Sequence, residues 1–178
     1  MAHNSLAVAN YFLKLAKAQG THLSPMKLQK LVYYAHGWHL ALKDEPLIDE
    51  QVEAWPYGPV IRSLYREFRG YGNHDITDKG SYYRYVRNPD GRLVPEIVTP
   101  VLSKEDPDGK FATALLDKVW DVYGKFSAIQ LSNKTHEEGT PWKQVFDQYQ
   151  GHLPKGTDIP IDLIKAYFRK LSQLESRL

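Results

Sequence analysis

Two short segments place histidines at spacings that could support metal or acid–base chemistry. HGWH sets His36 and His39 one helical turn apart, and HEE joins His136 to Glu137 and Glu138. A stable zinc site needs a third and usually a fourth ligand, the chain contains no cysteine, and HEE lacks the paired histidines of a metalloprotease helix. We therefore predict no metal site, and we interpret His39 as a core histidine that hydrogen-bonds locally.

The usual signatures of nucleophilic and cofactor-dependent catalysis do not appear in the sequence. No serine occupies a G-x-S-x-G pattern, and the glycines match neither a phosphate-binding loop nor a dinucleotide-binding fingerprint. Ser127 and Ser132 are typical of helix caps or surface positions. We predict that the protein is not an enzyme and uses no cofactor. The alternative left open is a small hydrolase that uses His136 with Glu137 or Glu138.

Arginines and tyrosines gather in two places in the chain. Basic residues among aromatic ones can bind single-stranded nucleic acid, which makes a nucleic-acid-binding regulator the second alternative. The net charge of +2 is small for such a domain, so we expect nucleic acid not to be a partner. Tyr and Arg are also enriched in protein interfaces. The first cluster contains Arg62, Arg66 and Arg69, and the second contains Arg84, Arg87 and Arg92 among Tyr82, Tyr83 and Tyr85.

The segment EAWPYGPV, residues 53–60, holds two large rings and two prolines between helical patterns. Proline fixes its own φ and restricts the residue before it, so this segment is expected to be rigid. In an extended chain Trp55 and Tyr57 share one face. That face either fills a gap in the core, packing on Tyr33 or Tyr34, or contacts a partner.

The elements that position these residues are mainly helical by their apolar periodicity. Ser24 is a good N-cap and Pro25 suits the first helical position, so a helix begins there, and its apolar residues (Leu28, Leu31, Val32, Ala35, Trp38 and Leu42) make it the central one. We predict short strands at 47–48 and 51–54, and a hairpin around NPDG at residues 88–91. The predicted helices cover about 5–19, 24–42, 59–70, 110–123, 127–136, 140–149 and 160–174. Pro59 opens the third helix in this prediction.

Length and composition are those of one soluble globular domain. The chain has 178 residues, no apolar run approaches the roughly 20 residues of a membrane helix, and the N-terminal segment MAHNSLAVAN lacks a basic region followed by an apolar run. The absence of cysteine is compatible with a reducing compartment. We expect a cytoplasmic protein, with no membrane contact, whose fold is a single mainly α-helical bundle with a small β-hairpin.

Several segments together resemble the Panacea domain, the SocA-like antitoxin domain of prophage-associated proteins and toxin–antitoxin operons. KLQKLVYYA at 27–35 and EAW-YGPV at 53–60 come in that family's order and spacing. LSNKTHEEGTPWK at 131–143 is similar to its later segment, and IPIDLIKAYFRKL is similar to its closing helix. Residues 76–105 depart from the family pattern.

The resemblance implies that residues 1–178 form one mainly helical antitoxin domain that neutralises a cognate protein toxin by binding it directly. It implies no catalytic residues. A basic rim around an aromatic centre is the layout of a protein interface. We therefore predict that the partner-binding residues are Trp55, Tyr57, Arg62, Arg66 and Arg69.

Overall fold

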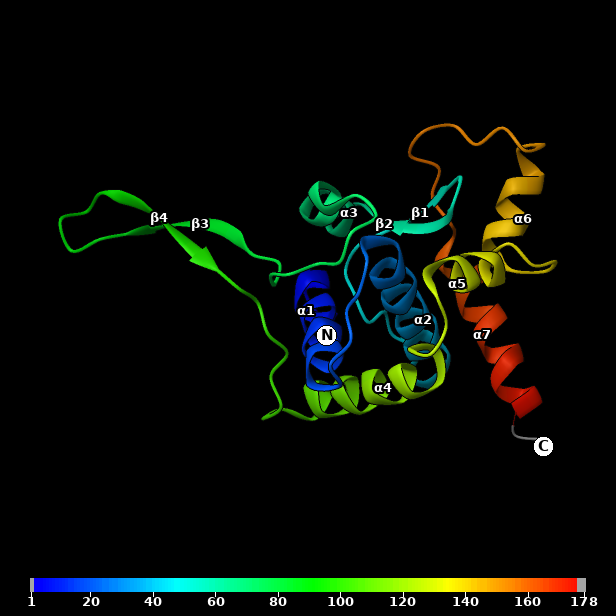
Figure 1. Ribbon diagram of the computed structural model, residues 1–178, viewed down its shortest axis with the longest axis horizontal. Helices are drawn as coiled ribbons and strands as arrows, with labels where there is room; N and C mark the ends of the chain where they lie inside the picture. The colour runs from blue at the N-terminus through cyan, green and yellow to red at the C-terminus, as the bar shows by residue number, and fades with distance from the viewer. Residues whose placement is uncertain (1, 176–178) are drawn as a thin grey trace.

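The computed structural model describes residues 2–175, and most of its elements are helices (Figure 1). This confirms a mainly α fold with small β-hairpins. No helix in this part of the chain is both long and apolar enough to cross a membrane. The helices are α1 (Ser5–Ala18), α2 (Pro25–Lys43), α3 (Arg62–Phe68), the 3-10 turn η1 (Arg69–Tyr71), α4 (Pro107–Tyr123), α5 (Ala128–Thr135), α6 (Pro141–Gln148) and α7 (Ile161–Glu175).

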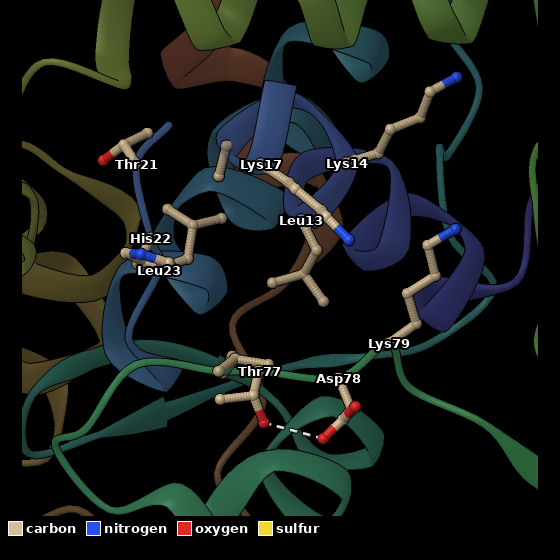
Figure 2. A pocket seen from close by; sticks show the side chains of 11 residues that line it. Leu13, Lys14, Lys17, Thr21, His22, Leu23, Thr77, Asp78 and Lys79 are labelled. Atoms are coloured by element: carbon tan, nitrogen blue, oxygen red, sulfur yellow. Dashed lines mark hydrogen bonds between the residues drawn. The ribbon is translucent and has the colours of Figure 1, made fainter. Parts of the chain in front are cut away.

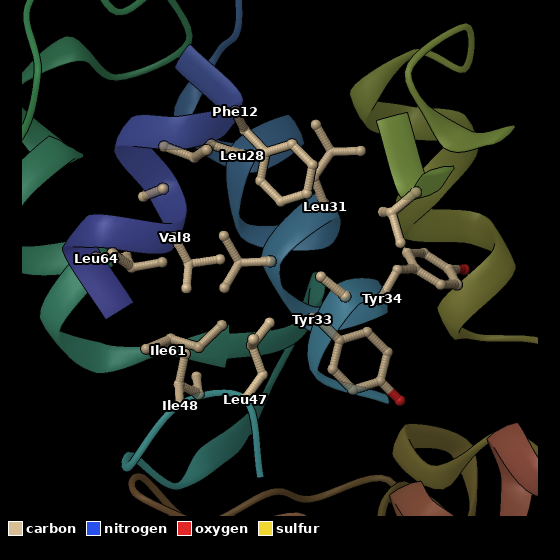
Figure 3. Packing of buried hydrophobic residues seen from close by; sticks show 14 of the residues in the cluster. Val8, Phe12, Leu28, Leu31, Tyr33, Tyr34, Leu47, Ile48, Ile61 and Leu64 are labelled. Atoms are coloured by element: carbon tan, nitrogen blue, oxygen red, sulfur yellow. The ribbon is translucent and has the colours of Figure 1, made fainter. Parts of the chain in front are cut away.

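Helix α2 lies at the centre, with α1, α4, α5 and α7 packed around it (Figure 1). It begins as predicted, because the Ser24 side chain accepts a hydrogen bond from the backbone N–H of Lys27 and Pro25 takes the first helical position. Most of its predicted apolar arc is buried, but Leu42 in the last turn is 56% exposed. Figure 3 shows Leu28 and Leu31 of α2 facing Val8 and Phe12 of α1 in the core.

Helix α4 begins three residues earlier than the sequence predicted. Asp106 is its N-cap, with a side chain that accepts a hydrogen bond from Gly109, and Pro107 is its first residue. The PDG at 107–109 is therefore the first turn of a helix and not a separate turn. The prediction missed this because Asp and Pro favour both a turn and a helix start.

Strands β1 (Val52–Trp55) and β2 (Gly58–Ile61) form an antiparallel hairpin that pairs Ala54 with Pro59. The prediction that Pro59 opens a helix is wrong, since α3 starts only at Arg62. The Gln29 side chain of α2 explains the later start. It accepts a hydrogen bond from the Ile61 N–H and donates one to the Ile61 carbonyl, which satisfies that residue in an extended conformation. The predicted strand at 47–48 is reduced to a single bridge between Ile48 and His3.

Strands β3 (Tyr82–Arg87) and β4 (Leu93–Val98) form the predicted hairpin around residues 88–91, here called the arm. They pair only with each other, and Figure 1 shows the arm projecting away from the helices. Its base is fixed by Asn10 of α1, whose buried amide donates to the carbonyls of Gly80 and Pro100 and accepts from the Gly80 N–H. One side chain therefore joins both ends of the arm to the body.

Candidate partner-binding site at the β1–β2 turn

The turn that joins β1 to β2, taken here with its flanking strand residues as 55–59, is held by side chains from three other segments. Each of four backbone carbonyls faces a donor group from α2, from α5 and its C-cap, or from α6. Trp142 Nε1 lies 2.7 Å from the Trp55 oxygen, His136 Nε2 lies 3.1 Å from that of Pro56, Ser132 Oγ lies 2.9 Å from that of Tyr57, and Lys30 Nζ lies 3.0 Å from that of Pro59. The turn is therefore fixed in place before any partner binds.

Gly58 is required by the same packing. Its φ is +103°, a conformation that side chains rarely adopt, and a Cβ added there would lie 2.6 Å from Thr135 Oγ1 and 2.9 Å from Lys30 Nζ. Gly58 therefore serves the backbone conformation of the turn. Side chains of α2 and α5 can approach the turn this closely only because glycine has no Cβ at position 58.

Trp55 and Tyr57 do not share a strand face, because the chain reverses between them. Trp55 is half-buried, with its ring 4.6 Å from that of Tyr65 and its indole N–H donated to Glu53. Tyr57 sits in the turn and is 71% exposed. The predicted packing on Tyr33 or Tyr34 is wrong, since those rings pack with Phe168 of α7. Trp55 supports the turn, and Tyr57 is presented outward.

A groove of about 280 Å³ lies between the turn, the start of α2, and α3 with η1. Its lining is mostly apolar and aromatic, with two cationic side chains. The residues that matter here are Met26, Lys30, Trp55, Tyr57, Tyr65 and Arg69.

The three arginines predicted for the rim differ in their surroundings. Arg62 makes a two-pronged ion pair with Glu53 of β1, through Nε at 2.6 Å and Nη2 at 2.9 Å. Hydrogen bonding from Arg62 is the main cause that lowers the pKa of Glu53. Arg66 and Arg69 are exposed, and Arg69 lines the groove. Arg62 therefore fixes α3 to β1, while Arg66 and Arg69 are free to meet a partner.

Lys30 is the residue of this site that the sequence did not reveal. Its side chain is almost fully buried, and burial lowers its pKa to about 7. Along the sequence it is one polar residue of an amphipathic helix, one turn from Lys27, which is typical of a solvated face. It is buried only because the β1–β2 turn and α5 close over α2.

His136 contacts the turn and the last turn of α5. Its Nδ1 lies 2.6 Å from the Ser132 carbonyl and its Nε2 lies 3.1 Å from the Pro56 carbonyl, and a neutral ring donates its one N–H to one of the two. The ring centroid lies 3.8 Å from that of Trp142. Glu138 pairs with Lys143 at 3.2 Å, away from the imidazole. The hydrolase alternative would need His136 to act with Glu137 or Glu138, and the Glu138 carboxylate is engaged by Lys143.

The HGWH histidines are core residues. His39 Nδ1 lies 2.7 Å from the Glu45 carbonyl, which confirms the expected local hydrogen bond. His36 is 2% exposed, burial lowers its pKa to about 4, and its Nδ1 has no hydrogen-bond partner. Among residues 2–175, no three His, Asp or Glu side chains gather as a metal centre needs.

A second cavity, of about 390 Å³, lies beside α1 (Figure 2). Its floor is apolar, with Leu13 and Leu23. Lys14, Lys17 and Lys79 stand around it, and Asp78 accepts a hydrogen bond from Thr77 at 2.8 Å. None of the predicted partner-binding residues lines it.

The arm carries the second cluster of arginines and tyrosines. Tyr83 and Tyr85 are each 69% exposed, whereas Arg84 is paired with Glu96 at 2.6 Å. Figure 1 shows the arm extending away from the helices. In addition, one arginine of each cluster is neutralised by a carboxylate.

The structure is a helical body that holds a turn with an exposed aromatic residue, and sequence comparison identifies the family. The chain belongs to the family described as "Antitoxin SocA-like, Panacea domain", which it matches over residues 28–143. That range contains the β1–β2 turn together with Lys30, Ser132, His136 and Trp142.

Among individual proteins, the chain is similar to Antitoxin SocA of Caulobacter vibrioides (strain NA1000 / CB15N). The two are 32% identical over 163 residues, which is 92% of this chain and 81% of that protein. No solved structure matches the chain.

Proposed function

We propose that this protein is an antitoxin that neutralises a cognate protein toxin by binding it directly. Membership of the SocA-like family and the similarity to Antitoxin SocA along most of the chain support this role. In this proposal residues 1–178 act as one domain, in the cytoplasm, and the gene belongs to a prophage or another mobile element. The protein performs no chemistry on its partner.

The observation that carries the proposal is the exposure of Tyr57 on a turn whose carbonyls are already bonded. A large ring left 71% exposed packs little of its surface in the free protein. Because the turn is rigid, little conformational entropy is lost when a partner covers the ring. Tyrosine in such a position is typical of an interface anchor.

The remaining interface residues follow from the groove. Trp55 forms part of its aromatic wall and Arg69 lines it, while Arg66 is exposed on the neighbouring α3. Arg62 contributes by holding α3 against β1 rather than by touching the partner. A basic rim favours a toxin surface of acidic character.

Both alternatives have less support. The hydrolase needs an imidazole free to act as a base, and His136 faces two carbonyls. The nucleic-acid regulator needs a continuous basic surface, and one arginine of each cluster, Arg62 and Arg84, is paired with a carboxylate.

The proposal is tested by calorimetric titration with the purified product of the neighbouring gene. Tyr57→Ala is expected to weaken binding by about 2 kcal/mol or more, roughly 30-fold, as loss of an interface anchor does. Arg66→Glu combined with Arg69→Glu should weaken it by more than about 1 kcal/mol.

Tyr149→Ala is the matched control, because this tyrosine is also exposed but lies at the end of α6. Its affinity should equal that of the wild type. If the Tyr57 variant and the double arginine variant both bind normally, the interface lies elsewhere. If the neighbouring product does not bind the wild type at all, the antitoxin assignment fails for that pair.

A further inference from the structure

We propose that the groove at the β1–β2 turn receives an aspartate or glutamate side chain of the toxin, with Lys30 as its counter-charge. This inference rests on the proposed function and adds the chemistry of the partner residue. It assigns a role to a side chain that neither the sequence motifs nor the interface residues explain.

The first step is that Lys30 carries a buried amino group without an anion beside it. Its side chain is 1% exposed, and its hydrogen bond is to the Pro59 carbonyl at 3.0 Å. A lysine ammonium has three N–H donors, so this carbonyl takes only one. Burial is the cause that lowers its pKa, and no carboxylate of the described residues contributes to that pKa. Buried charges in proteins are normally paired, because an unpaired one is costly.

The second step is that the groove leads to this residue. Lys30 lines it together with Trp55, Tyr57 and Tyr65, whose rings provide apolar walls. Charges attract more strongly in such surroundings than in water. A carboxylate entering the groove would therefore gain a strong partner, and Arg69 at the rim adds a second positive charge that draws it in.

The third step concerns the other titratable groups around Lys30. The turn contributes Tyr57, and α3 with η1 contributes Tyr65 and Arg69. The C-cap of α5 contributes His136, which faces the neighbouring Pro56 carbonyl, and on α2 itself Lys27 lies one turn earlier. None of these groups is a carboxylate, and the Glu53 carboxylate that accepts from Trp55 is engaged by Arg62, so the place of the counter-ion is left for the partner.

A side chain fits this groove better than the carboxyl terminus of a chain. Chain termini are typically captured by several successive backbone N–H groups. Here Pro25, Pro56 and the nearby Pro59 have no N–H to offer. A single lysine with apolar walls is instead suited to one carboxylate on an apolar stem.

The proposal has a measurable signature, which is proton uptake. A carboxylate beside Lys30 favours the charged ammonium and raises its pKa, so a complex formed at pH 8 should take up a proton that the free protein lacks. Titration of the full chain with the neighbouring gene product, in phosphate and in Tris at pH 8, gives the number of protons from the buffer dependence of the heat. We expect close to one proton, roughly 0.9, for the wild type.

Lys30→Met is the test variant, because methionine retains an apolar stem and removes the charge. It should take up no proton and should bind at least about tenfold more weakly. Lys27→Met is the matched control one helical turn away, and it should keep both the proton uptake and the affinity of the wild type. Circular dichroism of each variant establishes that it is folded.

If Lys30→Met does not fold, the pKa of Lys30 is measured by NMR at its Cε in the free and toxin-bound wild type. A pKa that rises on binding supports the proposal, and an unchanged pKa overturns it. Toxin binding that depends on Tyr57 but takes up no proton, or persists unchanged in Lys30→Met, overturns this inference while the proposed function stands. Absence of any complex with the wild type overturns the proposed function itself.

Discussion

His136 and Trp142 pack ring against ring, with centroids 3.8 Å apart. His136 Nε2 lies near the Pro56 carbonyl, and Trp142 Nε1 lies near the Trp55 carbonyl, so the two rings contact neighbouring carbonyls of the β1–β2 turn. His136 is the C-cap of α5, and Trp142 is the second residue of α6. The pair therefore joins two helices to the turn that presents Tyr57. This explains how a histidine among acidic residues can be structural.

His136→Gln should lower the free energy of unfolding by about 1–3 kcal/mol, because a hydrogen bond and a ring contact are lost. Urea denaturation followed by circular dichroism measures the change. His152→Gln is the control, since that ring is exposed and faces only the nearby Gln150 carbonyl. A hydrolytic activity that disappears in His136→Gln while the fold persists would replace the binding role with an enzymatic one.

Leu31→Ala should cost about 2–5 kcal/mol of unfolding free energy, because Leu31 is fully buried in the core around α2. Denaturant melts give the value. Leu42→Ala, on the same helix but 56% exposed, should change stability by less than about 0.5 kcal/mol. Equal effects of the two substitutions would contradict the position of α2 at the centre.

Arg62→Gln should lower the melting midpoint, whereas Arg66→Gln should leave it nearly unchanged, because only Arg62 is paired with Glu53. The sequence suggested that the two were equivalent exposed charges. The pair holds the pKa of Glu53 below its ordinary value of 4.5, so its stabilising effect is present above that pH and is lost as the pH falls through the lower, folded-state pKa. The melting midpoints of the wild type and Arg62→Gln, measured between pH 3 and 7, should therefore differ least at the acid end. A difference that stays constant over this range would argue against a contribution from the Arg62–Glu53 pair.

His36 should make the protein less stable as the pH falls from its ordinary pKa of 6.5 to about 4, its value in the folded protein. In this range the unfolded chain takes up a proton that the buried ring does not, so unfolding becomes more favourable. His36→Leu should reduce the loss of stability between pH 7 and pH 4 by on the order of 2–3 kcal/mol. His22→Gln, at an exposed position, is the control. Parallel stability curves for wild type and His36→Leu would be inconsistent with this mechanism.

Replacing residues 82–98 by a short Gly–Ser linker should leave the melting midpoint of the body nearly unchanged. The strands of the arm pair only with each other, and their side chains are mostly exposed. Asn10→Ala should be destabilising by contrast, because it leaves polar groups of Gly80 and Pro100 without their partner. Differential scanning calorimetry compares the two, and a large effect of the linker would mean that the arm contributes to the core.

The sequence alone was sufficient for much of the fold. Ser24 and Thr140 marked helix starts because a cap and a following proline act within a few residues. Residues 88–91 marked the hairpin for the same reason. The apolar arc of α2 indicated its central position, because burial of a periodic face is the main determinant of helix packing.

Predictions failed where a distant side chain decides a local conformation. Pro59 is as suitable for a helix start as for a strand, and Gln29 of α2 decides in favour of the strand by bonding both backbone groups of Ile61. Trp55 and Tyr57 appeared to share a face, but the chain reverses between them to form the hairpin.

The sequence by itself determined which residues gather near the site: the EAWPYGPV segment and the arginines that follow it. Only the tertiary structure decided their roles. Arg62 differs in role from Arg66 and Arg69 because it is paired with Glu53. Lys30 is buried by the turn and α5 rather than by residues of its own helix. The physical reason is that helix starts and turns are local, whereas burial and charge pairing are determined by segments far apart in the chain.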